Sequence, residues 1–137
     1  MMHINDTLTN FLNDSQKLSH STILLTDRNN IVFVSPININ YFDIFMNYSI
    51  SKDLKRLFKQ FHKQKKNEIL YSENSNSTIK LIYHDQIAYK SQFILPINTP
   101  LMEGLLIFFS TDRDYLPSNL RYAKTTKYFI EKLMKSS

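Results

Sequence analysis

The residues that could do chemistry in this sequence of 137 residues are few and scattered. A single glycine, Gly104, cannot form a glycine-rich phosphate loop or a dinucleotide-binding turn. The absence of cysteine excludes disulfides, thiolate metal ligands and thiol nucleophiles. No two histidines have the spacing of a metal-binding pair one helical turn apart; they are His3, His20, His62 and His84. We therefore expect no metal site, no cofactor and no catalytic residue.

One histidine is adjacent to an acid, as in a general acid–base pair: His84 precedes Asp85. The two residues lie where alternating apolar and polar stretches at 78–84 and 86–97 meet, so a hairpin turn is expected there. An exposed turn pair is the simpler interpretation. No nucleophile is paired with a base elsewhere in the sequence. We therefore expect a protein that is not an enzyme.

The highest concentration of charge lies in the segment 51–66, SKDLKRLFKQFHKQKK. Its apolar residues recur at helical spacing, and they are Leu54, Leu57, Phe58 and Phe61. Six cations occupy the opposite side: Lys52, Lys55, Arg56, Lys59, Lys63 and Lys66. Such a face can bind phosphate groups, but a solvated helix in a lysine-rich chain of net charge +5 has the same pattern. Because both phenylalanines point away from the cations, we do not expect nucleic acid as the main partner.

The segment 37–50, ININYFDIFMNYSI, is unusually rich in large apolar residues for a connection between strands. Its spacing predicts short helical turns that lie on a sheet. Such a cover either fills the core or closes a concave, mostly apolar ligand pocket, and the sequence leaves both alternatives open. The candidate ligand contacts, taken from this segment and from the strands expected to face it, are Tyr41, Phe45, Tyr48, Tyr83, Tyr89 and Gln92.

Hydrophobic periodicity sets the order of the elements that must position these residues. Helical spacing is found at 6–19 and 117–135, where Asp6 can cap the first helix and Pro117 can open the last. Strands are expected at 22–26, 30–35, 68–73, 78–84, 86–97 and 104–111. Most successive strands are joined by hairpins, so the sheet should be antiparallel.

Three of the strand regions are apolar at adjacent rather than alternate positions, within 22–35, at 93–95 and at 104–111. Strands of this kind are buried on both faces, so helices must cover both sides of the sheet. The pattern predicts an α+β fold of GAF- or PAS-like type, with an antiparallel sheet of about five to six strands. The N- and C-terminal helices would lie on one face and the short helices on the other.

We expect a single domain over residues 1–137. It comprises an N-terminal helix at 1–20, a sheet at 21–111 with helices inserted at 37–66, and a C-terminal helix at 117–135. No apolar run approaches the roughly 20 residues of a membrane span. The N-terminus, MMHINDTLTN, lacks the basic start and apolar core of a secretion signal. We therefore expect a cytoplasmic protein without a membrane partner.

Several motifs together resemble the GAF-like C-terminal domain of the stage V sporulation protein T regulators. They are ILLTDRNNIVFVSP, NYFDIF, SISKDL, FILPI with GLLIFFS, and AKTTKYFIEKLM. The resemblance spans residues 8–134 and implies a domain that responds to a small molecule and assembles through its helices. In that family an AbrB-type DNA-binding domain comes first. Only about twenty residues precede the first strand here, so we expect that domain and its DNA contacts to be absent.

The first and last helices carry more apolar surface than one face of a sheet needs. We expect them to pair with the same helices of a second copy, as a four-helix bundle in a homodimer. The predicted interface residues are Leu8, Phe11, Leu12, Phe129, Ile130, Leu133 and Met134.

These features predict a non-enzymatic GAF-like regulatory or sensor domain. It would bind an unidentified small molecule, form a homodimer and take part in the regulation of transcription or sporulation. Two alternatives remain open. One is a ligand-free scaffold of profilin- or roadblock-like type that recruits a partner protein, and the other is a basic accessory protein that binds nucleic acid.

Overall fold

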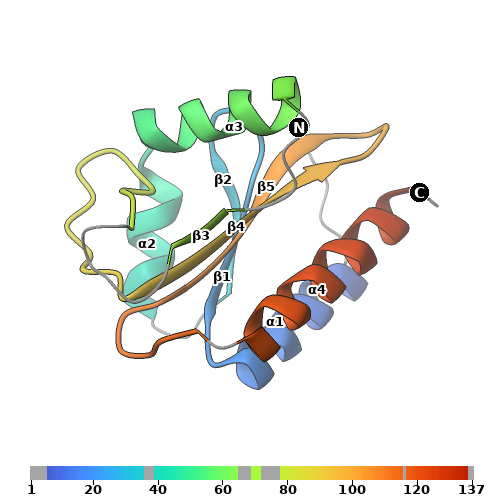
Figure 1. The fold of residues 1–137 in the computed structure, drawn as a ribbon, viewed down its shortest axis with the longest axis horizontal. Helices are drawn as coiled ribbons and strands as arrows, with labels where there is room; N and C mark the ends of the chain where they lie inside the picture. The colour runs from blue at the N-terminus through green and yellow to red at the C-terminus, as the bar shows by residue number, and fades with distance from the viewer. Residues whose placement is uncertain (1–5, 36–38, 65–68, 72–77, 116, 136–137) are drawn as a thin grey trace.

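The computed structural model describes residues 6–35, 39–64, 69–71, 78–115 and 117–135. They form one antiparallel sheet in the order β2-β1-β5-β4-β3, with helices on both sides (Figure 1). The strands are β1 (Thr22–Thr26), β2 (Ile31–Val34), β3 (Ile69–Tyr71), β4 (Ser91–Asn98) and β5 (Glu103–Ser110). The helices are α1 (Asp6–Ser19), α2 (Ile39–Asn47), α3 (Lys52–Gln64) and α4 (Pro117–Lys135). The architecture is α+β, as the sequence predicts.

The helices form one layer on each face of the sheet: α1 and α4 lie together on one face, and α2 and α3 on the other (Figure 1). Every residue of β1 is buried, and every residue of β5 except the first. Leu24 packs in the core under α2 and α3, whereas its neighbours Ile23 and Leu25 pack in the core under α1 and α4. Successive side chains of a strand point to opposite faces, so the predicted burial of these strands on both faces is confirmed.

The helices agree well with their predicted ranges. α1 and α4 cover 6–19 and 117–135, and two helices, α2 and α3, lie within 37–66. Positions 37–38 and 65–66 of that prediction lie outside the described residues. The predicted strand at 68–73 is observed as the three-residue β3, and the rest of it also lies outside them.

The predicted count of five to six strands is too high at its upper end. The described residues form four strands of four to eight residues, together with the short β3. The predicted strand at 78–84 is not formed, and only an isolated bridge joins Ile82 to Ile50. The strand predicted at 86–97 is shortened to β4.

Side chains take the place of the missing strand ladder. The carboxylate of Asp85 accepts hydrogen bonds from the backbone N–H groups of Leu81 at 2.8 Å and Ile87 at 2.9 Å. The amide of Gln92 on β4 accepts from the N–H of Ile79 at 3.0 Å and donates to its carbonyl at 2.8 Å. These backbone groups are thus satisfied without a strand partner, and Leu81 of the same segment packs in the core under α2 and α3.

The single glycine lies where β5 approaches the backbone of β1. A Cβ at Gly104 would be 2.1 Å from the carbonyl oxygen of Thr26 and 2.4 Å from the Cε of Met102. The methionine side chain can move, but the carbonyl belongs to the backbone of β1. The hydroxyl of Thr26 also accepts a hydrogen bond from the N–H of Leu105 at 3.2 Å, which fixes the two strands beside the glycine. Gly104 is therefore required for a close backbone contact rather than for a turn.

We expect Gly104→Ala to lower the free energy of unfolding by about 2–3 kcal/mol, because the added methyl group must push β5 away from β1. Urea denaturation measures this change. Thr111→Ala, at an exposed position just beyond β5, is the control and should change stability by less than about 0.5 kcal/mol. Equal effects of the two substitutions would show that the close contact with Thr26 is not what stabilises this part of the sheet.

Candidate functional site

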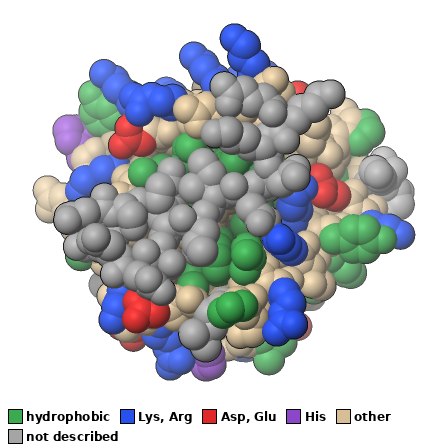
Figure 2. Space-filling model, viewed as in Figure 1, with side chains coloured by type: hydrophobic (Ala, Val, Ile, Leu, Met, Phe, Trp, Pro, Cys, Tyr) green, Lys and Arg blue, Asp and Glu red, His purple; other side chains and the backbone are tan. Residues whose placement is uncertain are grey.

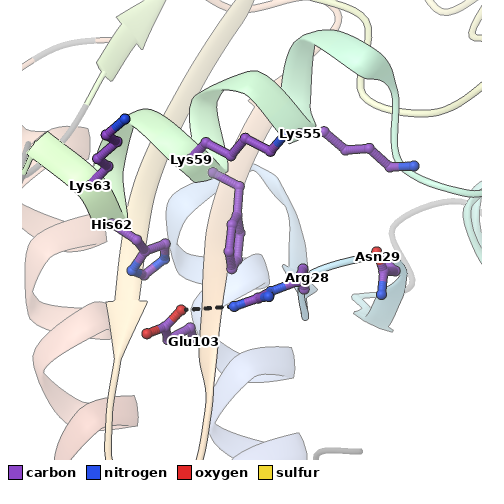
Figure 3. Close-up of a pocket in the computed structure, with 8 residues that line it drawn as sticks. Arg28, Asn29, Lys55, Lys59, His62, Lys63 and Glu103 are labelled. Atoms are coloured by element: carbon purple, nitrogen blue, oxygen red, sulfur yellow. Dashed lines mark ion pairs between the residues drawn. The ribbon is translucent and has the colours of Figure 1, made fainter.

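A pocket of about 580 Å³ opens between α3 and the turns at one end of the sheet (Figure 3). The β1–β2 turn, α3 and the start of β5 contribute its lining, which consists of Arg28, Asn29, Lys55, Phe58, Lys59, His62, Lys63 and Glu103. Lysine and arginine side chains gather along α3 on the surface of the molecule (Figure 2). The lining contains four cationic side chains and a histidine but only one acid, Glu103. The charge of the lining therefore favours an anion.

Ser51 attaches the start of α3 to residues 80–81 of the same chain. Its hydroxyl accepts a hydrogen bond from the N–H of Leu54 at 3.0 Å, as an N-cap does, and donates to the carbonyl of Lys80 at 2.6 Å. Its own N–H donates to the carbonyl of Leu81 at 2.9 Å. The apolar stripe of the helix is buried in the core, and its members are Leu54, Leu57, Phe58 and Phe61. The rotation of α3 is thus set by burial, which leaves its basic side outside.

Three exposed lysines of α3 line the pocket at four-residue spacing: Lys55, Lys59 and Lys63. Residues four apart are neighbours on one face of a helix, and like charges there destabilise it by a few tenths of a kcal/mol per pair. No acidic side chain of α3 lies among the pocket residues. A bound anion would remove this repulsion.

The β1–β2 turn brings Arg28 over the same pocket. The carboxylate of Asp27 accepts hydrogen bonds from the N–H groups of Asn29 and Asn30, both at 2.8 Å, and so closes the turn. The guanidinium carbon of Arg28 then lies 5.9 Å from the centre of the Phe58 ring. The turn thus has a structural role, and its exposed arginine forms one wall of the pocket.

Glu103 and His62 complete the lining. Glu103 lies 3.6 Å from Arg28, but the two side chains are 45% and 73% exposed, so the pair contributes little and can exchange partners. The ring of His62 lies 4.5 Å from that of Phe58, and its Nε2 is 3.4 Å from the carbonyl oxygen of Gly104. The pocket therefore has an aromatic floor next to exposed charged groups.

The six residues predicted to contact a ligand do not come together in one site. Phe45, Tyr89 and Gln92 are buried to at least 96%. The rings of Phe45 and Tyr89 both pack on Phe109, at centroid distances of 5.6 and 5.0 Å, and the partly buried Tyr41 lies 5.7 Å from the same ring. The amide of Gln92 is already engaged with Ile79. The sequence left open whether these residues line a ligand pocket or pack in the core, and in the structure they pack in the core.

The other two, Tyr48 and Tyr83, form an exposed aromatic cluster with His84. They are 45% and 52% exposed, and their ring centres lie 6.4 and 4.7 Å from that of His84. His84 has φ of 60° at the tip of a turn. The expectation of an exposed pair is wrong for Asp85, which is buried because its carboxylate bonds to the backbone N–H groups around it.

Four of the predicted dimer contacts are buried within the chain, in the core that α1 and α4 form with the sheet: Leu8, Leu12, Ile130 and Met134. Phe11 and Phe129 pack on each other across the two helices with ring centres 4.0 Å apart. These two rings and Leu133 are only partly buried. The apolar surface of the helices is largely used inside one chain, because they pack on each other as well as on the sheet. A dimer through this seam stays a prediction that rests on the three partly buried residues.

Sequence patterns identify the lysines of α3 but miss the rest of the pocket. Phe58 and His62 lie close to the apolar side of the helix, where a core position is the default expectation. Arg28 and Glu103 are far apart in the sequence, and only the antiparallel pairing of β1 with β5 brings them together. No local signal announces such a contact.

Among the described residues, no three histidine, aspartate or glutamate side chains are grouped so that they could hold a metal ion. No helix within the described residues is long and apolar enough to cross a membrane. The expectations of no cofactor and no catalytic residue stay predictions.

Comparison with known proteins supports the fold but not a family. No protein-family model and no curated protein sequence matches the chain. Among solved structures, nine chains match, including the GAF domain/HD domain protein from Geobacter sulfurreducens. That match has a TM-score of 0.63 at 10% sequence identity and covers 96% of this chain and 94% of the other. The fold is GAF-like. The narrower likeness to the stage V sporulation protein T regulators has no support from these comparisons.

Two buried tyrosines link stability to alkaline pH. Burial, with the nearby charge of Asp85 and a hydrogen bond of 2.5 Å to it, raises the pKa of Tyr89 far above its usual 10.0. Burial also raises the pKa of Tyr115, whose hydroxyl donates to Ser21. Because the folded-state pKa values are raised, the neutral tyrosines stabilise the fold below about pH 10, and this contribution is lost as pH rises further.

We therefore expect the free energy of unfolding to fall above pH 10, by up to about 1.4 kcal/mol per pH unit for each buried tyrosine. Tyr89→Phe should lower stability at neutral pH but reduce this alkaline slope. Tyr128→Phe, at a side chain that is 60% exposed, should leave the slope unchanged. Urea denaturation between about pH 9 and 11 measures both slopes, and an unaltered slope in Tyr89→Phe would contradict the assignment.

Proposed function

We propose that this chain is a non-enzymatic regulatory domain that senses a small anionic molecule bound in the α3 pocket. The observation that carries the proposal is the lining of that pocket, which contains four cationic side chains and a histidine but a single acid. Its volume of about 580 Å³ lies within the range of small-molecule sites. The GAF-like fold is compatible with a sensing role, but the fold alone does not establish one.

Each part of the pocket has a role in this proposal. The lysine stripe at 55, 59 and 63 provides charge-assisted hydrogen bonds to an oxyanion group such as phosphate, sulfate or carboxylate. Arg28 can leave Glu103 and add a fork of donors, because their ion pair is exposed and weak. The rings of Phe58 and His62 offer an apolar floor to the rest of the ligand.

Binding would be transmitted through α3 and the turns that meet it. α3 packs on β4 and β5, and His62 reaches the carbonyl of Gly104 on β5. A ligand that draws Arg28 and the lysines together favours one arrangement of the turn relative to the helix, and so shifts the population of states. Dimerisation would be the means of passing this shift to a second chain. A role in transcription or sporulation rests on the sequence resemblance alone.

The proposal is tested by ligand-induced thermal stabilisation, with inorganic phosphate, sulfate, nucleotides, amino acids and acyl compounds as probes. A ligand at about 100 times its dissociation constant adds about 2.7 kcal/mol to the free energy of unfolding. The double variant Lys55→Gln/Lys59→Gln should weaken binding of the selected anion by about tenfold or more, because two charge-assisted contacts are lost. Titration calorimetry measures the affinity.

Lys52→Gln is the matched control, since Lys52 is an exposed lysine of the same helix outside the pocket lining. It should leave the affinity unchanged within about twofold, because an exposed charge that does not contact the ligand is weakened by solvent and salt. If Lys52→Gln, which removes one charge, lost half as much binding free energy as the double variant, which removes two, only overall charge would matter. Silence across the whole panel would favour a scaffold that works without a ligand.

A second candidate function is supported by the exposed aromatic cluster of Tyr48, Tyr83 and His84. The cluster lies at the start of α3, since the N–H of Tyr83 donates to the carbonyl of Ser49 at 2.9 Å. Exposed rings at one end of a lysine-rich helix are compatible with binding of single-stranded nucleic acid, in which bases stack on aromatic side chains and phosphates contact cations. The phenylalanines of α3 face the core and cannot stack on bases, but Tyr48, Tyr83 and His84 are exposed and can.

If the chain binds single strands, the affinity for a short oligonucleotide should fall linearly on a plot of log affinity against log salt concentration. Tyr83→Ala should lower the affinity by about 1–3 kcal/mol through lost stacking, whereas Tyr128→Ala on α4 should not. Fluorescence anisotropy measures both. If no binding is found at low salt, this candidate fails, while the small-anion proposal stands or falls on its own titration.

A further inference from the structure

A second opening, of about 560 Å³, runs beside β2 on another part of the molecule. α1, β2 and α2 contribute its lining, which consists of Thr9, Asn13, Val32, Phe33, Val34, Phe42 and Met46. None of these side chains is charged, in contrast to the α3 pocket. We refer to this opening as the β2 groove.

The β2 groove follows the open edge of the sheet. Val32, Phe33 and Val34 are consecutive residues of one strand, so their side chains cannot all lie on the same face. A groove that touches all three must run along the edge between the two faces. β2 is the outermost strand on this side, and among the described residues β1 is its only strand partner. A bridge of Asn30 to Ser49 lies beside the start of β2, but among the described residues no strand pairs with the outer edge of β2 itself.

The rim of the groove also carries exposed apolar side chains that an apolar partner could cover. Phe42 and Met46 lie one turn apart on α2 and are 46% and 42% exposed. Edge strands of monomeric proteins are commonly protected by lysine, proline or a bulge. The sequence of β2, IVFV, contains no charge and no proline, and the register shift with β1 lies toward its Ile31 end. The remainder of the edge has no such protection.

We propose that the β2 groove binds the β2 edge of a second copy of this chain, in antiparallel pairing about a two-fold axis. An occupant must offer strand hydrogen bonds and uncharged apolar side chains, and the β2 edge itself offers both. A surface that pairs with its own copy satisfies two-fold symmetry directly. In this arrangement Phe42 and Met46 of each copy cover the apolar rim of the other.

The charge distribution favours this surface for self-association. The chain carries a net charge of +5, and its cationic α3 face would repel the same face of another copy. The β2 groove has no charged residue in its lining, so two copies can meet there without placing like charges in contact. This interface differs from the predicted seam between α1 and α4, where four of the seven residues are already buried.

Sedimentation equilibrium over concentrations up to about 1 mM tests the proposal. We expect the full chain to form a dimer, and Phe42→Lys to raise its dissociation constant at least tenfold, because it replaces an apolar contact with a charge against the uncharged groove of the other copy. Tyr128→Lys is the matched control, because this side chain on α4 is also large, aromatic and exposed. A chain that stays monomeric throughout overturns the proposal, as does a dimer that Phe42→Lys leaves intact.

The lack of cysteine in the chain permits a second measurement that does not depend on destabilising the interface. A spin label at Met46→Cys should report a short distance between the two copies, and a label at Tyr128→Cys a much longer one. The reverse order would place the interface at α4 and refute pairing through β2. Circular dichroism of each variant establishes that it is folded.

Discussion

The structure depends on burying both faces of the central strands β1 and β5. Their successive side chains enter two separate cores, one under α2 and α3 and the other under α1 and α4. Removing either helical layer would expose apolar area that stabilises the fold at about 25 cal/mol per Å². The sheet therefore holds the helices in place more than their own propensity does. Their outer surfaces are free to carry function, as charge on α3 and as apolar residues on α2.

The fold was predictable where burial imposes a local pattern. Adjacent apolar residues in β1 and β5 required two covering layers, and the spacing of α1, α3 and α4 gave their positions. The failure at 78–84 has a physical cause: alternation reports which side chains are buried, not which groups accept the backbone hydrogen bonds. Asp85 and Gln92 perform that task, and Gln92 is 13 residues from its partner Ile79. No periodic pattern within a strand contains this information.

The candidate site was less predictable because its parts are brought together by strand pairing. The lysines of α3 form a stripe that the sequence displays, but Arg28 meets Glu103 only through the pairing of β1 with β5. Aromatic residues misled in the opposite way. Phe45 and Tyr89 have the composition of a ligand pocket, yet their rings fill the core around Phe109. Residue type alone does not distinguish an aromatic side chain that lines a pocket from one that packs in the core.

The side-chain attachment of residues 78–90 has a consequence for motion. A segment held by Asp85 and Gln92, instead of by a strand ladder, can open as a unit at a free energy below that of global unfolding. Ser51 bonds to the carbonyls of Lys80 and Leu81, so such an opening would also release the first turn of α3. Amide hydrogens in the two places would then exchange with solvent together, while those of β1 and β5 remain protected. α3, the helix that lines the pocket, thus packs on the sheet and is attached at its first turn to a segment that can open separately from that sheet.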